Sequence, residues 1–345
     1  MNTRLNQTSP PTANPTRRLL GAAMVLLLAV AILPPPAARA GGKVNVVPEE
    51  PAIVLAVFGT SYPEALPGIL TIYHEVREAY PETTVRLAFT SNIIRRIWHK
   101  RRDDARFRRQ HPEIPATIYQ VKAPLATIAN LVDEDYGQIV VQPTHIAAAE
   151  EFHDLKAVVD ALNNIRTIKE RNRPFRQLVL GRPALGAPGI GHPYREDLAK
   201  AAAALADDVQ QARDEDSALV YMAHGNQYFS TGVFMELEHL MRQLYPEVDT
   251  YLAQESGFPD LELLVQRLVD DGVEQALLVP LMTVAGDHAR NDLAGSADDS
   301  LQSRLTAAGI KSRAQLVGLG EKRRFARLFV DHLGEAAAGA AIDLQ

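Results

Sequence analysis

An internal repeat is the feature of this sequence that most restricts its architecture. In the first half, a continuous apolar run ends at Gly59, and a helical pattern over about residues 66–80 leads to the tripeptide Tyr-Pro-Glu. In the second half, an apolar run ends at Gly225, and an amphipathic helical pattern again leads to Tyr-Pro-Glu. The spacing is 22 residues from Gly59 to Pro81 and 21 residues from Gly225 to Pro246. Because strand, glycine, helix and tripeptide recur in one order, we infer an internal duplication.

The repeat continues through a second pair of segments, residues 137–155 and 274–293. Each has the pattern of a strand that contains a proline, followed by a short link and a polar helix start. When Pro143 is aligned with Pro280, Glu151 lies opposite His288. Strands that alternate with helices of 12 or more residues form parallel sheets, so the sequence predicts the α/β class.

Two similar α/β halves are therefore expected, over residues 51–195 and 196–345. In parallel sheets of this kind, ligands bind beyond the carboxyl ends of the strands. Asp287 and His288 come directly after an apolar strand. We therefore expect them at a functional edge of the sheet rather than in the core.

Three side chains form the candidate metal site. His224 follows an apolar strand and precedes a glycine, where a satisfied structural histidine is the alternative interpretation. His288 occupies a strand end in the same half, and Glu151 occupies the matching place in the other half. Two imidazoles and one carboxylate leave open coordination positions, and this ligand set suits a divalent metal such as Co²⁺, Fe²⁺ or Ni²⁺.

Further polar residues lie near these positions in the sequence. His145 is a further candidate for the same site, either as a metal ligand or as a residue that faces the substrate. Glu150 and His153 are three residues apart and could bind metal on a helix, although a solvated helix start is the simpler explanation. Asp287 could orient His288 or cap the helix that follows.

Composition excludes several other classes of protein. The chain has no cysteine, so disulfides, thiolate nucleophiles and thiolate metal sites are excluded. Its 36 Lys and Arg against 42 Asp and Glu give a net charge of −6, which argues against a general nucleic-acid binder. There is no Walker lysine pattern, no dinucleotide-binding GxGxxG after a strand and no GxSxG elbow. Nucleotide binding and serine hydrolysis are therefore not expected.

The first 40 residues have the pattern of a signal peptide. Arg17 and Arg18 precede an apolar run over residues 19–33, and Ala38-Arg39-Ala40 supplies the small residues of a cleavage site. The alternatives are an uncleaved membrane anchor and export by the twin-arginine route. No second long apolar segment follows, so we expect a periplasmic protein that starts near Gly41 and has no membrane span after cleavage.

One basic segment stands out in this acidic chain. Residues 95–120 hold seven Arg and one Lys, and the second half has no equivalent. A solvated helix face is the simplest explanation. A surface for self-association is another, as is a haem site in which His99 is the axial ligand, Trp98 offers an aromatic face and the arginines pair with the propionates.

Several motifs together resemble a known family. They are FGTSY at 58–62, AFTS at 88–91, MAHG at 222–225, PLMTVAGDHARND at 280–292 and GLGE at 318–321. The sequence is similar here to the anaerobic sirohydrochlorin cobaltochelatases of the CbiK type. It departs from the family at Ala223, where relatives often have glycine, and in the long basic segment.

The resemblance implies a fold, a site and a reaction. The fold would be two α/β domains whose parallel sheets face a central cleft. His224, His288 and Glu151 would bind the metal, and His224 would also accept pyrrole protons, since the ordinary pKa of imidazole is near neutrality. Co²⁺ would enter sirohydrochlorin without ATP, while Arg and Lys at the rim would orient the substrate carboxylates. Ferrochelatase-type insertion of Fe²⁺ and non-catalytic periplasmic binding of metal or tetrapyrrole are the alternatives.

Overall fold

The computed structural model of the chain describes residues 47–189 and 191–345. The predicted signal peptide, residues 1–40, lies outside the described residues. Within the described part of the chain, no helix is long and apolar enough to cross a membrane.

The first half forms a four-stranded sheet in which every pair of neighbours is parallel. The strand order is β2-β1-β3-β4. The bounds of the strands are β1 Glu50–Val57, β2 Thr84–Phe89, β3 Tyr136–Pro143 and β4 Gln177–Leu180.

The second half repeats this arrangement in the order β6-β5-β7-β8, again with parallel pairs throughout. These strands are β5 Ala218–Gly225, β6 Thr250–Ser256, β7 Gln275–Pro280 and β8 Lys311–Ala314. Pro143 and Pro280 are the last residues of β3 and β7, so they remove no ladder hydrogen bond from the middle of either sheet. Equal strand order in the two halves supports the duplication, and the predicted α/β class with parallel sheets is confirmed.

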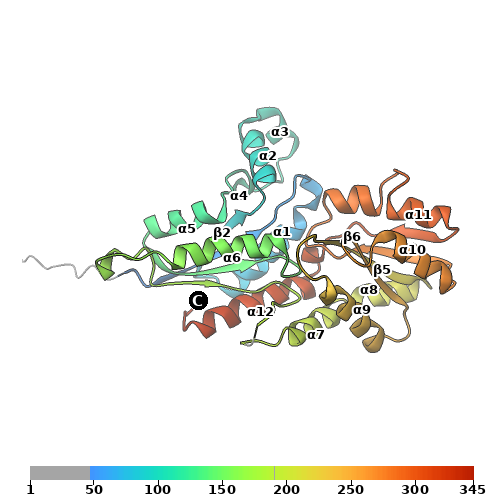
Figure 1. Cartoon of the computed structure of the whole chain (residues 1–345). Coiled ribbons are helices and arrows are strands. Elements are labelled where there is room, and N and C mark those ends of the chain that lie inside the picture. Colours follow the sequence, from blue (N-terminus) through green and yellow to red (C-terminus); the bar gives the residue numbers. More distant parts are fainter. Residues whose placement is uncertain (1–46, 190) are drawn as a thin grey trace, which may run out of the picture. The chain divides into compact units, whose positions relative to one another are not determined.

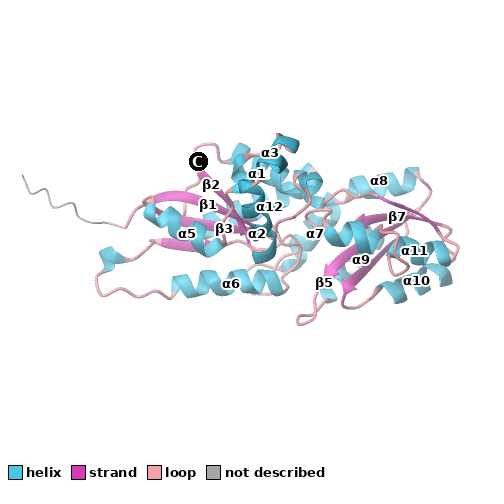
Figure 2. Cartoon of the chain, turned by 90° about the horizontal axis from the view of Figure 1, so that it is seen from above, coloured by secondary structure: helices cyan, strands magenta, loops and turns pink. Residues whose placement is uncertain are grey.

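Helices connect the strands and pack on the sheets (Figure 2). Those of the first half are α1 Pro67–Ala79, α2 Asn92–Asp103, α3 Ala105–Gln110, α4 Ala116–Tyr119, α5 Pro124–Asp133 and α6 Glu150–Asn163. The others are α7 Tyr194–Ala204, α8 Ala206–Asp214, α9 Gly232–Leu244, α10 Leu261–Asp270, α11 Leu301–Ala307 and α12 Arg323–Gly339. In Figure 1, α2 and α3 stand away from the first sheet, and this is the basic segment of the sequence.

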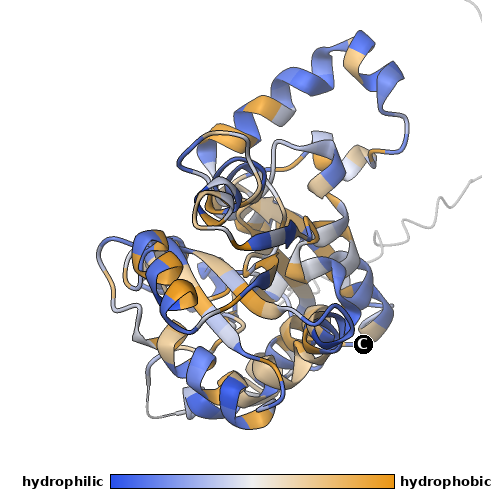
Figure 3. Cartoon of the chain, turned by 90° about the vertical axis from the view of Figure 1, so that its right-hand side faces the viewer, coloured by the Kyte–Doolittle hydropathy of each residue, from blue (hydrophilic) through white to orange (hydrophobic). Residues whose placement is uncertain are grey.

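The apolar strands are buried on both faces. In β1, Ile53, Leu55 and Val57 belong to one hydrophobic cluster. The alternate residues Ala52, Val54 and Ala56 belong to another, on the opposite face of the sheet. Successive side chains of a strand point to opposite faces, so a strand covered on both sides must be apolar throughout. In Figure 3 the helices combine hydrophilic and apolar residues, whereas the central strands are largely apolar.

The last helix returns to the first sheet. Helix α12 packs against α1, β3 and β4 of the first half. The Gln177 side chain on β4 donates a hydrogen bond of 2.8 Å to the carbonyl oxygen of Ala340, just after α12. The described residues belong to one compact unit. The predicted boundary between the two halves at residue 195 therefore stays a prediction. Helix α12 belongs to the second half and packs against the first.

Candidate metal-binding site

A glycine fixes the end of strand β5. Gly225 has φ of +76°, and a Cβ there would lie 1.8 Å from the carbonyl oxygen of Ser256. Only glycine adopts this left-handed conformation at such a close backbone approach without strain. Strands β5 and β6 pair Ala223 with Gln254 and Gly225 with Ser256, and this register places His224 beside Glu255.

His288 lies after β7, at the start of a π-helical turn, η3, over Ala289–Leu293. Its Nδ1 is 2.6 Å from Oδ2 of Asp292. Because a carboxylate accepts this hydrogen bond, Nδ1 carries the proton and Nε2 is left to bind a metal. Single π turns occur frequently at functional sites.

His224, Glu255 and His288 form a compact donor set. One ligand atom from each lies within 4.8 Å of the others. The two imidazole rings have their centroids 4.5 Å apart and are nearly perpendicular, at 87°. Nδ1 of His224 donates to the Gly225 carbonyl at 3.0 Å, which again leaves Nε2 available. Two imidazoles and one carboxylate fit a divalent first-row metal with open coordination positions.

The third member of this set differs from the predicted one. Glu151, at the start of α6, lines the same cavity as both histidines. Glu255 instead completes the close group, and it was missed in the sequence. The sequence YLAQES at 251–256 does place Glu255 at the end of a strand. Only the β5–β6 register, however, shows that Glu255 neighbours His224. A ligand role for Glu151 stays a prediction.

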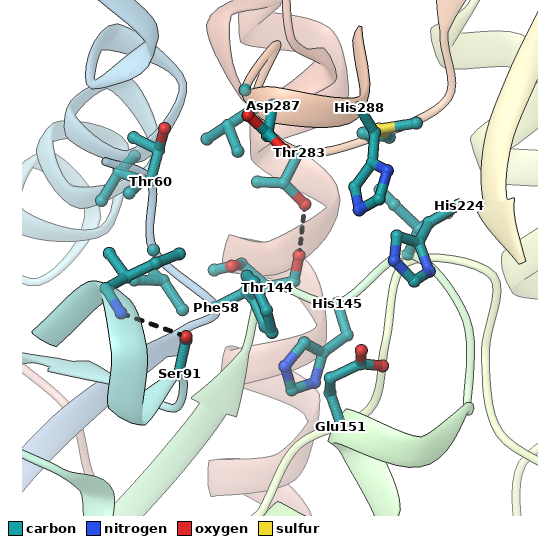
Figure 4. Close-up of a pocket in the computed structure, with 18 of the residues that line it drawn as sticks. Phe58, Thr60, Ser91, Thr144, His145, Glu151, His224, Thr283, Asp287 and His288 are labelled. Atoms are coloured by element: carbon teal, nitrogen blue, oxygen red, sulfur yellow. Dashed lines mark hydrogen bonds between the residues drawn. The ribbon is translucent and has the colours of Figure 1, made fainter. Parts of the chain in front are cut away.

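A cavity of about 470 Å³ lies beside the donor set. Its walls come from segments of both halves. The links after β3 and after β7 occupy equivalent places in the repeat, whereas the Phe58–Tyr62 loop and the start of α2 belong to the first half. The Thr283 hydroxyl donates a 2.6 Å hydrogen bond to the carbonyl oxygen of Thr144, which joins the two links (Figure 4). Figure 4 shows the His224 and His288 imidazoles pointing toward one another, with Glu151 and His145 on the facing first-half segment. The cavity has the size range of ligand pockets, about 300–1,000 Å³.

His145 is brought into this cavity, as the sequence suggested. The residue is partly exposed, but both of its ring nitrogens are buried and have no hydrogen-bond partner within residues 47–189 and 191–345. Burial lowers the pKa of His145 to about 4, because the charged imidazolium would lose its hydration. His145 is therefore neutral near pH 7, and its unpaired ring nitrogens lie buried in the cavity wall.

Glu150 and His153 contact a loop of the other half. The Glu150 carboxylate accepts hydrogen bonds from the backbone amides of Gln227 and Tyr228, at 2.8 and 3.1 Å. The His153 ring stacks on Phe229, with centroids 4.2 Å apart and planes at 6°. The loop that follows His224 is thus held against α6.

Asp287 has a different role from either one considered in the sequence. Its Oδ1 accepts from the Tyr62 hydroxyl at 2.7 Å and from the Asn291 amide at 3.0 Å. The hydrogen bond to Asp287 raises the pKa of Tyr62, and burial and the carboxylate charge add to this shift. Asp292 orients His288 instead. The two residues are four positions apart, and this spacing could have indicated the contact from the sequence, because such residues are neighbours on a helix.

The basic segment contradicts one part of the haem hypothesis. Trp98 is fully buried and donates from Nε1 to the Thr60 carbonyl at 2.7 Å, so it offers no exposed aromatic face. It is buried because it packs edge-to-face on Phe107 and Tyr119. Nε2 of His99 is 2.7 Å from the Val121 carbonyl and donates to it, which leaves Nδ1 for any ligand. Haem binding at His99 stays a prediction.

Two parallel sheets of equal strand order, with two imidazoles and a carboxylate beside one cavity, form a site suited to a metal chelatase. A sequence model described as cobalt chelatase (CbiK) matches residues 51–338, and the chain belongs to this family.

Two relatives agree with this assignment, and one solved structure has a similar fold. The chain is 30% identical to the sirohydrochlorin cobaltochelatase CbiKC of Nitratidesulfovibrio vulgaris, over 84% of this chain and 91% of the relative. It is 29% identical to the sirohydrochlorin cobaltochelatase of Salmonella typhimurium, over 83% and 96%. The sirohydrochlorin chelatase SirB from Bacillus subtilis subspecies spizizenii, solved in complex with cobalt, has a similar fold. Its TM-score is 0.52 at 10% identity, over 86% of this chain and all of that one. At this identity the likeness supports the fold alone.

Proposed function

We propose that this protein is a sirohydrochlorin cobaltochelatase, which inserts Co²⁺ into sirohydrochlorin without ATP. The observation that carries the proposal is the donor set of His224, Glu255 and His288 beside a cavity of about 470 Å³. Family membership and the names of both relatives support the metal and the tetrapyrrole.

The reaction needs two things from the protein. Co²⁺ must exchange bound water for four tetrapyrrole nitrogens, and two pyrrole N–H groups must lose their protons, so each turnover releases two protons. The three side chains of the donor set would hold Co²⁺ beside the cavity and leave other coordination positions open. The metal could then pass to the tetrapyrrole nitrogens. The Glu151 carboxylate, or Nε2 of His224 once the metal has left it, would accept the protons, since both residues line the cavity. His145 would face the macrocycle as a neutral imidazole.

Metal insertion into sirohydrochlorin tests the function directly. The purified chain, without residues 1–40, is mixed anaerobically with sirohydrochlorin and Co²⁺, and the absorption spectrum is followed with time. We expect conversion to cobalt-sirohydrochlorin faster than in the protein-free control, and no acceleration over that control by the His224→Ala/His288→Ala double variant. Parallel reactions with Fe²⁺ and Ni²⁺ identify the preferred metal. Tight binding of metal and tetrapyrrole without faster insertion would instead identify a carrier.

We also propose export to the periplasm, on the basis of the residue pattern at 1–40 alone. The mature protein would then start near Gly41. Intact-mass measurement on protein from the periplasmic fraction of the native host tests this, and a soluble protein that retains Met1 would contradict it.

Haem binding at His99 and self-association through the basic segment are further proposals. Nδ1 of His99 is the ring nitrogen left for an axial bond, because Nε2 donates to Val121. A haem titration of the mature protein should give a Soret shift that His99→Ala removes, and the same samples report the oligomeric state by light scattering. Unchanged haem binding in the variant would exclude His99.

A further inference from the structure

A second cavity lies within the basic segment. It measures about 470 Å³ and is formed by the end of α2 together with α3 and α4. Its polar lining comes from Arg102, Arg108, Arg109, His111, Tyr119 and Gln120. None of its lining residues belongs to the cavity beside His224, so the two cavities are separate. Helix α2 contributes its first turns to one and its last turn to the other.

The charge of this second cavity is positive. Among the residues that the structure describes, no carboxylate lines it. Arg102 pairs with Asp103, and His111 lies 3.1 Å from Glu113. Arg108 and Arg109 make no ion pair with any residue in the described part of the chain. Their guanidinium groups are therefore available to an anionic ligand.

Tyr119 adds an independent observation. Its side chain is only 6% exposed, and its hydroxyl is buried without a hydrogen-bond partner among the described residues. The Arg108 guanidinium lies 5.7 Å from the centre of the Tyr119 ring. Buried polar groups in proteins are nearly always hydrogen-bonded, so an unpartnered hydroxyl in the wall of a cavity indicates a missing ligand atom.

The two arginines also indicate the chemistry of that ligand. A guanidinium presents its N–H groups as a planar fork that matches two oxygens of a carboxylate or phosphate. Two adjacent forks favour a ligand with more than one negative charge, and the remaining walls, which include Pro112, Ile114 and Ala116, are apolar.

We propose that this cavity is a second ligand site, which binds a small polyanion through the Arg108 and Arg109 guanidinium groups and the Tyr119 hydroxyl. The ligand carries phosphate or carboxylate groups. The site is distinct from the metal centre, because no residue is shared between the cavities.

Calorimetric titration of the mature protein tests the proposal, with inorganic phosphate and citrate as probes at constant ionic strength. Glycerol is the neutral control. We expect saturable binding of one equivalent of at least one anion, and the stronger of the two identifies phosphate or carboxylate chemistry. Arg108→Gln/Arg109→Gln should weaken binding by at least about tenfold, since two charge-assisted contacts are lost. Tyr119→Phe should weaken it by about threefold or more while it keeps the ring in place.

A matched variant separates this site from general attraction of anions. Arg96→Gln/Arg106→Gln removes the same charge from α2 and α3, but neither residue lines the cavity. We expect it to bind as the wild type does, and all variants to keep their far-ultraviolet circular dichroism. Equal weakening in both double variants, or no saturable binding of either anion, would overturn the proposal. The His224→Ala/His288→Ala variant should bind the anion normally, so failure of the chelatase function would be a separate result.

Discussion

Gly225 determines where the His224 imidazole lies. Its positive φ turns the chain where a side chain would collide with the Ser256 carbonyl, and the β5–β6 register then brings Glu255 alongside. The two histidines could be recognised from the sequence because each follows an apolar strand. Glu255 could not, since its partnership depends on strand pairing across 31 positions of sequence, from Gln254 to Ala223.

Glu255→Gln and Glu151→Gln distinguish the two candidate carboxylates. Loss of a direct ligand should cost more than the roughly 10–100-fold in affinity that follows from changes around a ligand. We therefore expect Glu255→Gln to weaken Co²⁺ binding by more than about 100-fold. Glu151→Gln should leave binding nearly unchanged and slow insertion by about 100-fold if Glu151 accepts protons. Competition with a Co²⁺ indicator measures affinity, and the sirohydrochlorin assay measures rate. The reverse pattern would restore Glu151 as the ligand.

Asp292→Asn tests the orientation of His288. The 2.6 Å contact fixes the ring and places the proton on Nδ1. Without the carboxylate, Co²⁺ affinity should fall by about 10–100-fold. Asp287→Asn is the matched control, because Asp287 bonds to Tyr62 and Asn291 rather than to His288. If both variants bind Co²⁺ as the wild type does, Asp292 has no part in the site.

At the level of elements, the apolar runs predicted the strands correctly, but the sequence did not predict which type of helical turn follows each strand. The helix expected at 66–80 is α1, Pro67–Ala79, and proline at its first position is favoured because its missing N–H needs no partner there. The polar helix starts expected after Pro143 and Pro280 differ from each other. The first is α6, whereas the second is the π turn η3, because the side-chain pattern of a few residues does not distinguish i+4 from i+5 bonding.

The contact of α6 with the loop after β5 carries a prediction of its own. Glu150→Gln replaces the charged acceptor of the Gln227 and Tyr228 amides, and hydrogen bonds to charged groups are worth about 1.5–3 kcal/mol. We expect amide hydrogen exchange at Gln227 and Tyr228 to accelerate by about tenfold or more. The KM for sirohydrochlorin should rise with little change in Co²⁺ affinity, because the loop adjoins the cavity.

Asp160→Asn serves as the control for this loop. Asp160 lies on the same helix and pairs with Lys156 near solvent. Exchange at Gln227 and Tyr228 should be unaffected by this change. Wild-type exchange rates in Glu150→Gln would show that the loop is held by other contacts.

At the scale of the whole molecule, a network of hydrogen bonds and ion pairs around the buried Asp197 connects the two halves. Its side chain, on α7, is inaccessible to solvent and accepts two hydrogen bonds from Arg182, at 2.6 and 2.8 Å. His332 on α12 lies 3.1 Å away, and His192 lies 3.0 Å away. The network thus links the segment after β4, the helix that opens the second half and the helix that returns to the first sheet. No repeat or motif in the sequence indicated it, because its members are far apart in the chain.

This network predicts how stability depends on pH. Burial acts to raise the pKa of Asp197, but hydrogen bonds from His332 and Arg182 outweigh it and hold the pKa well below its ordinary value. A carboxyl group with a lowered pKa in the folded state binds fewer protons there than in the unfolded state. Its stabilising contribution is therefore complete above the ordinary pKa of about 3.9 and is lost as the pH falls toward the folded value.

Asp197→Asn should accordingly lower the free energy of unfolding by about 3 kcal/mol at pH 7, because Arg182 is left without its buried partner. The same variant should show a shallower loss of stability between about pH 4 and pH 2 than the wild type, since one of the groups that titrates there is absent. Urea unfolding at a series of pH values measures both effects. Asp207→Asn, which removes an exposed partner of Arg324, should reproduce the wild-type curve. If Asp197→Asn also reproduces it, the network does not stabilise the junction between the halves.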